Sequence, residues 1–267
     1  MDTIELRKIV GNSDIFGKLK NDDKIFFLNI FDILNNNDIN KEEFILHGFE
    51  CSFVEGSPKL RVLHLEFPGI LLNKEMKIKI KKRREKKISE VIRSMGNYFN
   101  VEYDVDLCKK IFEFNDGRVN FPIQIGLEYE ENKKPKIKIY LSVNSSDFPL
   151  SLFFKIMNID KRAVMNGFLE NSKFDAVAVD FMPDKKSSLK LYPLTSRDSG
   201  LLVRISETGE IFSKKSWVRF QGGLGQERFL GNSFFNLPLF LQNRIRKDNL
   251  KVSYLCLEGK KKSVYFR

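Results

Sequence analysis

The stretch KIKIYLS, residues 136–142, alternates aliphatic residues with lysines, a tyrosine and a serine. In an extended strand, residues two apart point to the same face and successive residues point to opposite faces. The stretch is therefore predicted to be a strand with an aliphatic face and a face on which Lys138 lies beside Tyr140. The same pattern recurs at residues 190–192 (KLY), late in another alternating run.

Similar runs recur along the chain in pairs, separated by turn residues such as the Glu55–Pro58 stretch. The pairs that we interpret as hairpins are Phe44–Val54 with Leu60–Phe67, Phe121–Tyr129 with Lys136–Asn144, Phe174–Met182 with Ser188–Thr195, Leu201–Thr208 with Ser216–Gln221, and Leu250–Leu257 with Lys262–Arg267. Hairpins imply antiparallel pairing. The sequence therefore predicts about ten antiparallel strands, the last of which runs to the C-terminal residue.

Segments with helical spacing lie between these hairpins. They are Ile25–Leu34, a segment with Ile88, Val91, Ile92 and Met95 on one face, Val105–Phe112, Leu150–Ile159, Ala163–Leu169 and Phe234–Ile245. Such helices need an apolar surface to cover, so the aliphatic strand faces are expected beneath them. The polar faces then form either an open surface or, if the sheet closes, a lumen that about ten strands make roomy. No Pro- or Ser-rich linker divides residues 1–267, which we interpret as one domain.

The composition is basic, with 46 Lys and Arg against 35 Asp and Glu and a net charge of +11. This excess favours an anionic partner, which is a nucleic acid, a membrane surface or a phosphorylated small molecule, unless the Lys-rich composition reflects an AT-rich genome. The three cysteines have no CxxC spacing, which is typical of a reduced, cytoplasmic protein. No run approaches the roughly 20 apolar residues of a spanning helix, and the N-terminus does not resemble a signal peptide.

The stretch FDAVAVDF, residues 174–181, is followed after a short turn by LKLY, residues 189–192. Together with the hairpin count and the two Lys-x-Tyr patterns, it resembles the ABBA, or PT-barrel, aromatic prenyltransferases, and locally the small branch that prenylates cyanobactin-type peptides. The resemblance implies an α+β fold of αββα repeats, with a closed ten-stranded antiparallel barrel around the active site and helices outside. It also implies transfer of a dimethylallyl or longer prenyl group from an allylic diphosphate to an aromatic small molecule or a peptide side chain.

The resemblance assigns roles by position along the strands. It implies that the diphosphate is bound by Arg61, Lys138, Lys190 and Arg204, that the allyl cation is shielded by Tyr140, Tyr192 and Tyr265, and that Glu50 is the proton partner of the acceptor. The chain lacks a DDxxD pattern, so no metal ligands are assigned and no cofactor is required by the sequence. Magnesium could accompany the diphosphate through its own oxygens. The protein is expected to act as a monomer.

Other interpretations stay open at this point. The barrel could bind an amphipathic anion without catalysis, or the basic stretch Lys77–Lys87 could form an exposed nucleic-acid surface. Glu50 could instead pair with Arg61 across the first hairpin. Asp180 could orient a lysine in the lumen, and Trp217 with Arg219 could line the substrate entrance or simply pack.

Overall fold

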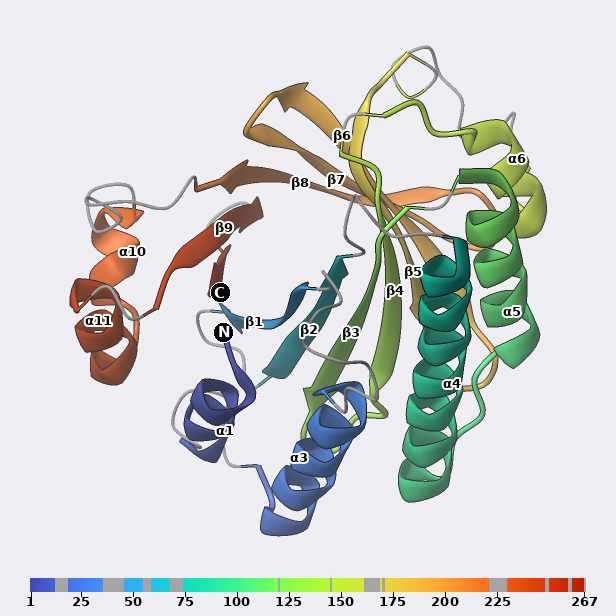
Figure 1. Ribbon diagram of the computed structural model, residues 1–267. Coiled ribbons are helices and arrows are strands. Elements are labelled where there is room, and N and C mark those ends of the chain that lie inside the picture. The colour runs from blue at the N-terminus through green and yellow to red at the C-terminus, as the bar shows by residue number, and fades with distance from the viewer. Residues whose placement is uncertain are drawn as a thin grey trace.

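The computed structural model describes residues 1–12, 19–35, 46–54, 59–67, 74–119, 121–144, 146–160, 169, 171–220, 230–247, 250–258 and 261–266. Within these residues, ten strands close into a barrel in the order β1-β10-β9-β8-β7-β6-β5-β4-β3-β2. Every neighbouring pair is antiparallel. The α+β fold with a closed antiparallel barrel and outer helices (Figure 1) is therefore confirmed.

The strands form the five predicted hairpins. They are β1 (Leu46–Val54) with β2 (Lys59–Phe67), β3 (Ile123–Glu130) with β4 (Lys136–Ser142), β5 (Phe174–Phe181) with β6 (Ser187–Ser196), β7 (Ser199–Ile205) with β8 (Ile211–Arg219), and β9 (Val252–Glu258) with β10 (Lys261–Phe266). The fourth turn was predicted too late, because β8 begins at Ile211 and not at Ser216. Gly209 has a φ of 85°, a conformation that glycine adopts without steric penalty, and it makes the turn there.

Helices lie outside the barrel wall (Figure 1). They are α1 (Thr3–Gly11), α3 (Asn21–Asn35), α4 (Lys74–Phe99), α5 (Val105–Phe114) with the π-helical turn η1 (Asn115–Val119), α6 (Leu150–Ile156), α10 (Asn232–Phe235) and α11 (Leu239–Arg246). Helix α1 was not predicted. The single helix expected over Phe234–Ile245 is wrong, because Pro238 separates α10 from α11 and cannot continue a helical hydrogen-bond ladder. Most of the helix predicted over Ala163–Leu169 lies outside the described residues.

The apolar core lies between the outer faces of the strands and the helices. Ile125 and Ile139 stand opposite each other on β3 and β4, and both are buried. On β2, His64 also faces outward and packs against Phe49, whose ring meets Phe31 of α3 with centroids 5.8 Å apart. His64 thus lies on the helix-facing side of the barrel wall. Among the described helices, none combines the length and the apolar character needed to cross a bilayer.

The basic stretch Lys77–Lys87 lies in α4, and its described part is not a uniformly solvated face. Arg83, Arg84 and Lys87 are buried, and Lys87 donates to the carbonyl oxygen of Leu34 at 2.6 Å. Arg84 forms an ion pair of 3.2 Å with Asp116 of η1. Several of these cations therefore join α4 to its neighbours, which disfavours the nucleic-acid interpretation.

Candidate functional site

Strand register brings the predicted cations to the inner face of the barrel. Arg61 and Lys136 both stand opposite Glu128, and Lys190 stands opposite Arg204. Lys138 stands opposite Asp180. Residues directly opposite on antiparallel strands share a face. The aliphatic partners point outward, so the cations of four different strands meet inside the lumen.

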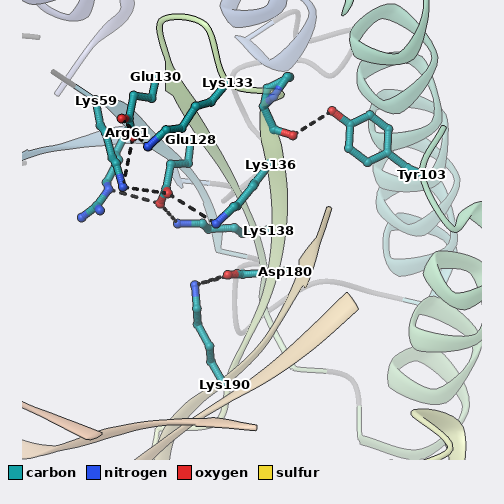
Figure 2. A network of polar contacts seen from close by, with 11 residues as sticks. Lys59, Arg61, Tyr103, Glu128, Glu130, Lys133, Lys136, Lys138, Asp180 and Lys190 are labelled. Carbon is teal, nitrogen blue, oxygen red and sulfur yellow. Dashed lines mark hydrogen bonds and ion pairs between the residues drawn. The ribbon is translucent and has the colours of Figure 1, made fainter. Parts of the chain in front are cut away.

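Glu128 on β3 is the hub of this cluster (Figure 2). Its carboxylate lies 2.5 Å from Lys138 Nζ and 3.2 Å from Arg61 Nε. Lys59 and Lys136 each place Nζ 4.0 Å from it. Burial alone would raise the pKa of Glu128, but Lys138, Arg61 and Lys190 outweigh burial and lower it. Glu128 is therefore a buried, ionised carboxylate surrounded by cations.

Lys190 and Asp180 form a second buried pair next to this hub, with Lys190 Nζ 2.6 Å from Asp180 Oδ1 (Figure 2). Lys190 is 2% exposed and Asp180 is 3% exposed. Burial lowers the pKa of Lys190 well below its usual value, although Asp180 opposes the shift. Burial would raise the pKa of Asp180, yet Lys190 and Lys138 lower it. The prediction that Asp180 could orient a lumen lysine is consistent with this ion pair.

Arg204 completes the cluster from β7. Its buried Nε has no hydrogen-bond partner among the described residues. We call Lys59, Arg61, Lys136, Lys138, Lys190 and Arg204 the cation cluster. Its six cations outnumber the carboxylates with which they form ion pairs, which are Glu128, Asp180 and, for Lys59, Glu130. Buried cations favour an anionic partner, so an excess of them is suited to bind a further anion.

Aromatic rings follow the cation cluster along the same strands. Tyr140 and Tyr192 each lie two residues from a cluster lysine, on the side away from the hairpin turns, and their ring centroids are 6.1 Å apart. The ring centroids of Tyr265, on β10, and Tyr254 are 6.4 Å apart. Burial raises the pKa of Tyr140, Tyr192 and Tyr265. All three phenols are therefore neutral at physiological pH.

These rings border a cavity of about 620 Å³, which we call the aromatic cavity. Its lining includes Glu50, Tyr140, Tyr192, Trp217, Tyr254 and Tyr265. A volume of this size can hold a small organic ligand. The structure thus gathers all eight predicted site residues in one lumen, with four in the cation cluster and four along the aromatic cavity.

Glu50 on β1 is 4% exposed and accepts a hydrogen bond from the hydroxyl of Ser253. In the β1–β2 register it stands opposite Leu63, whereas Arg61 pairs with Glu128 of the next strand. The alternative in which Glu50 is the hairpin partner of Arg61 is therefore wrong. Glu50 and Asp175 are both carboxylates in the lining of the aromatic cavity.

Arg219 forms a group of contacts at the cavity wall, which the sequence predicted only in part. The guanidinium of Arg219 donates to Asp175, and its Nε donates to the hydroxyl of Tyr254 at 3.2 Å. The same guanidinium lies 5.9 Å from the ring centroid of Trp217. Both Trp217 and Arg219 line the aromatic cavity, as one of the two predictions for them stated. Sequence reasoning assigned no role to Asp175, Tyr254 or Glu128.

The carboxylates of the lumen show whether the protein itself could bind a metal ion there. In the described part of the chain, no three His, Cys, Asp or Glu side chains come close enough together to hold an ion. Glu128 and Asp180 are both in contact with lysine ammonium groups. These residues do not fit a metal site built from protein carboxylates alone.

The fold and the lumen together define a closed ten-stranded antiparallel barrel of the PT-barrel type, with its polar and aromatic side chains inside. Among solved structures, the chain is similar to a 6-dimethylallyl tryptophan synthase, with a TM-score of 0.57 and 13% identity over 100% of this chain and 95% of that one. It is also similar to the 6-dimethylallyltryptophan synthase from Micromonospora olivasterospora in complex with DMASPP and Trp. The TM-score there is 0.56, with 12% identity over 99% of this chain and 96% of that one. No protein-family model and no curated protein sequence matches the chain.

Proposed function

We propose that this protein is an aromatic prenyltransferase, which moves a dimethylallyl or longer prenyl group from an allylic diphosphate to an aromatic acceptor. One observation carries the proposal. Inside one barrel, a cluster in which cations outnumber carboxylates adjoins a cavity lined by aromatic rings. A diphosphate with an apolar, cation-forming tail needs both surfaces next to each other. The shared fold with a protein that forms a complex with DMASPP and Trp supports the same assignment.

In the first step, the bond between the allylic carbon and the diphosphate oxygen breaks, and the oxygen keeps the electron pair. Arg61, Lys138, Lys190 and Arg204 are the proposed ligands of the departing diphosphate. Their charges are in place before the reaction, in a lumen where electrostatic contacts count for more than in water. Arginine offers a planar fork of donors and lysine a point charge, so the two residue types complement each other.

The allyl cation left behind must be kept from water. Tyr140, Tyr192 and Tyr265 are the proposed shields, because an aromatic face stabilises a nearby cation by about 0.5–2 kcal/mol. Burial keeps their phenols protonated, and a neutral phenol is a poorer nucleophile than a phenolate. The shields therefore protect the cation without capturing it.

In the second step, a carbon of the acceptor ring attacks the allyl cation and forms the new carbon–carbon bond. The ring then loses a proton, and Glu50 is the proposed acceptor of that proton. Ser253 donates to Glu50 and holds its carboxylate at the cavity wall. If magnesium takes part, the diphosphate oxygens would carry it, because the lumen carboxylates are in contact with lysines. Indoles, phenols and peptide side chains are the acceptor classes to be compared, and the last class includes the cyanobactin-type peptides.

The test combines binding and turnover. The chain has one tryptophan, Trp217, which lines the cavity, so its fluorescence can report binding of a non-hydrolysable allyl diphosphate. We expect the parent to bind the analogue, and Lys138→Ala and Lys190→Ala to lose affinity by about 10- to 100-fold. Lys82→Ala, on the exposed side of α4, is the matched control and should bind like the parent.

Turnover is measured by mass spectrometry of products formed from dimethylallyl and geranyl diphosphate with indole, phenol and peptide acceptors. A prenylated acceptor is the expected product, with some prenyl alcohol. A parent protein that neither binds nor hydrolyses any allyl diphosphate would contradict the proposal. Binding without transfer or hydrolysis would instead identify a non-catalytic carrier of amphipathic anions.

A further inference from the structure

The geometry around Glu128 is unusual for a carboxylate in an anion site. Glu128 lies on β3, between the two strands that supply its partners. Arg61 and Lys59 reach it from β2, and Lys138 and Lys136 reach it from β4. One carboxylate thus lies at the convergence point of four cations, and it is 8% exposed. Two of these cations, Arg61 and Lys138, are also proposed ligands of the diphosphate.

The presence of Glu128 among these cations has a physical reason in the ligand-free barrel. Buried cations without an anion repel one another and lose hydration, so the lumen would be destabilised. Glu128 supplies the missing negative charge, because it accepts a hydrogen bond from Lys138 and forms an ion pair with Arg61. A diphosphate that uses the same two side chains must replace these bonds or share them.

We infer that Glu128 is a resident counter-anion of the cation cluster, which stabilises the empty barrel and weakens diphosphate binding by competing for Lys138 and Arg61. The inference rests on the proposed function and concerns the same site. It makes Glu128 a positioning residue, because it acts through the cations and not on the reacting atoms. It also sets the diphosphate affinity of the barrel below the value that its cations alone would give.

A purely structural role for Glu128 predicts the opposite sign. If the carboxylate only held Lys138 and Arg61 in a productive arrangement, its removal would let them move and would weaken diphosphate binding. If it competes with the ligand, its removal strengthens binding. The direction of the affinity change therefore distinguishes the two roles.

The experiment is calorimetric titration of the full chain with inorganic diphosphate, in EDTA so that no divalent cation bridges the groups. Glu128→Gln keeps the shape of the side chain and removes its charge. We expect it to bind diphosphate about tenfold more tightly than the parent, which is the effect of one competing charge-assisted hydrogen bond. Glu128→Asp keeps the charge on a shorter side chain and should give a smaller increase.

Glu130→Gln is the matched control. It lies two residues along the same strand and makes ion pairs with Lys59 at 3.2 Å and with Lys133 at 2.7 Å. These pairs lie at the rim, where Lys133 is 66% exposed, so we expect an affinity within about twofold of the parent. A tenfold gain in this control as well would overturn a specific role for Glu128, because it would reflect net charge alone.

Thermal unfolding supplies an independent measurement. Without ligand, Glu128→Gln should unfold at a lower temperature than the parent, and saturating diphosphate should raise its unfolding temperature by more than it raises that of the parent. If Glu128→Gln does not fold, the affinity of Glu128→Asp decides. Weaker diphosphate binding by the variants, with binding retained in the parent, would overturn the inference and leave the proposed function intact. No diphosphate binding by the parent would overturn the proposed function itself.

Discussion

The cation cluster and the aromatic cavity share one lumen, but their side chains are held in different ways. In the cluster, charged groups are locked to one another, as in the 2.6 Å contact between Lys190 and Asp180. Along the cavity, rings stand 5.9–6.4 Å apart between centroids and border an open space of about 620 Å³. If the proposed function holds, the charged half recognises one fixed group, the diphosphate, whereas the shape of the aromatic half selects the acceptor.

The largest expected effect concerns the carboxylate of the aromatic half. Glu50→Gln should lower the rate of prenyl transfer by about 10²- to 10⁴-fold, the usual contribution of a general base. Diphosphate affinity should stay within about twofold, because Glu50 lines the aromatic cavity outside the cation cluster and charge interactions weaken with distance. Single-turnover kinetics and calorimetry measure the two quantities. A variant that loses both together would break the separation between the two halves.

A smaller effect is expected when the charged half is unbalanced. Lys190→Met leaves Asp180 buried without its ion-pair partner, so the free energy of unfolding should fall by about 3–5 kcal/mol. The double variant Lys190→Met/Asp180→Leu removes both charges and should recover most of that loss. Urea unfolding compares the two. Equal stability of the single and double variants would show that the pair is solvated and not a buried unit.

The smallest expected effect lies at the boundary between the halves. A Cβ at Gly126 would come within 3.1 Å of both Lys138 Cβ and Tyr140 Cε2. Gly126→Ala should therefore destabilise the protein by about 1–3 kcal/mol through overpacking and displace the ring of Tyr140. Thermal unfolding measures the first effect, and the share of prenyl alcohol among the products, which should rise, measures the second. An unchanged product ratio would argue against Tyr140 as a shield.

Much of this site was predictable because a strand has a period of two. Once KIKIYLS is a strand with a buried aliphatic face, Lys138 and Tyr140 must share the other face, whatever the rest of the chain does. The same reasoning placed Lys190 beside Tyr192. The number of hairpins followed from the turn residues. The resemblance to PT-barrel enzymes favoured a lumen over an open surface for the polar strand faces.

The remaining features depend on long-range register, which local patterns do not contain. Glu128 becomes a hub only because β2 and β4 pair with β3 in one particular register, so that Arg61 and Lys136 both stand opposite it. A one-residue slip would have moved these side chains to the other face. Asp175, near the start of β5, meets Arg219, at the end of β8, across a sequence separation of 44 residues and between different hairpins. Local spacing also predicted one helix over Phe234–Ile245, whereas Pro238 separates two helices there.

The closure of the barrel has a consequence for biosynthesis. Strand β1 pairs with β10, so that Ser52 stands opposite Tyr265, and these strands are separated by nearly the whole sequence. During translation β1 has one neighbour only, and its second edge stays open until residue 266 has left the ribosome. Open strand edges are templates for aggregation, so the nascent chain is protected at this edge only once β10 has paired with β1, or by a chaperone. The lumen is enclosed only when this pairing has closed the barrel.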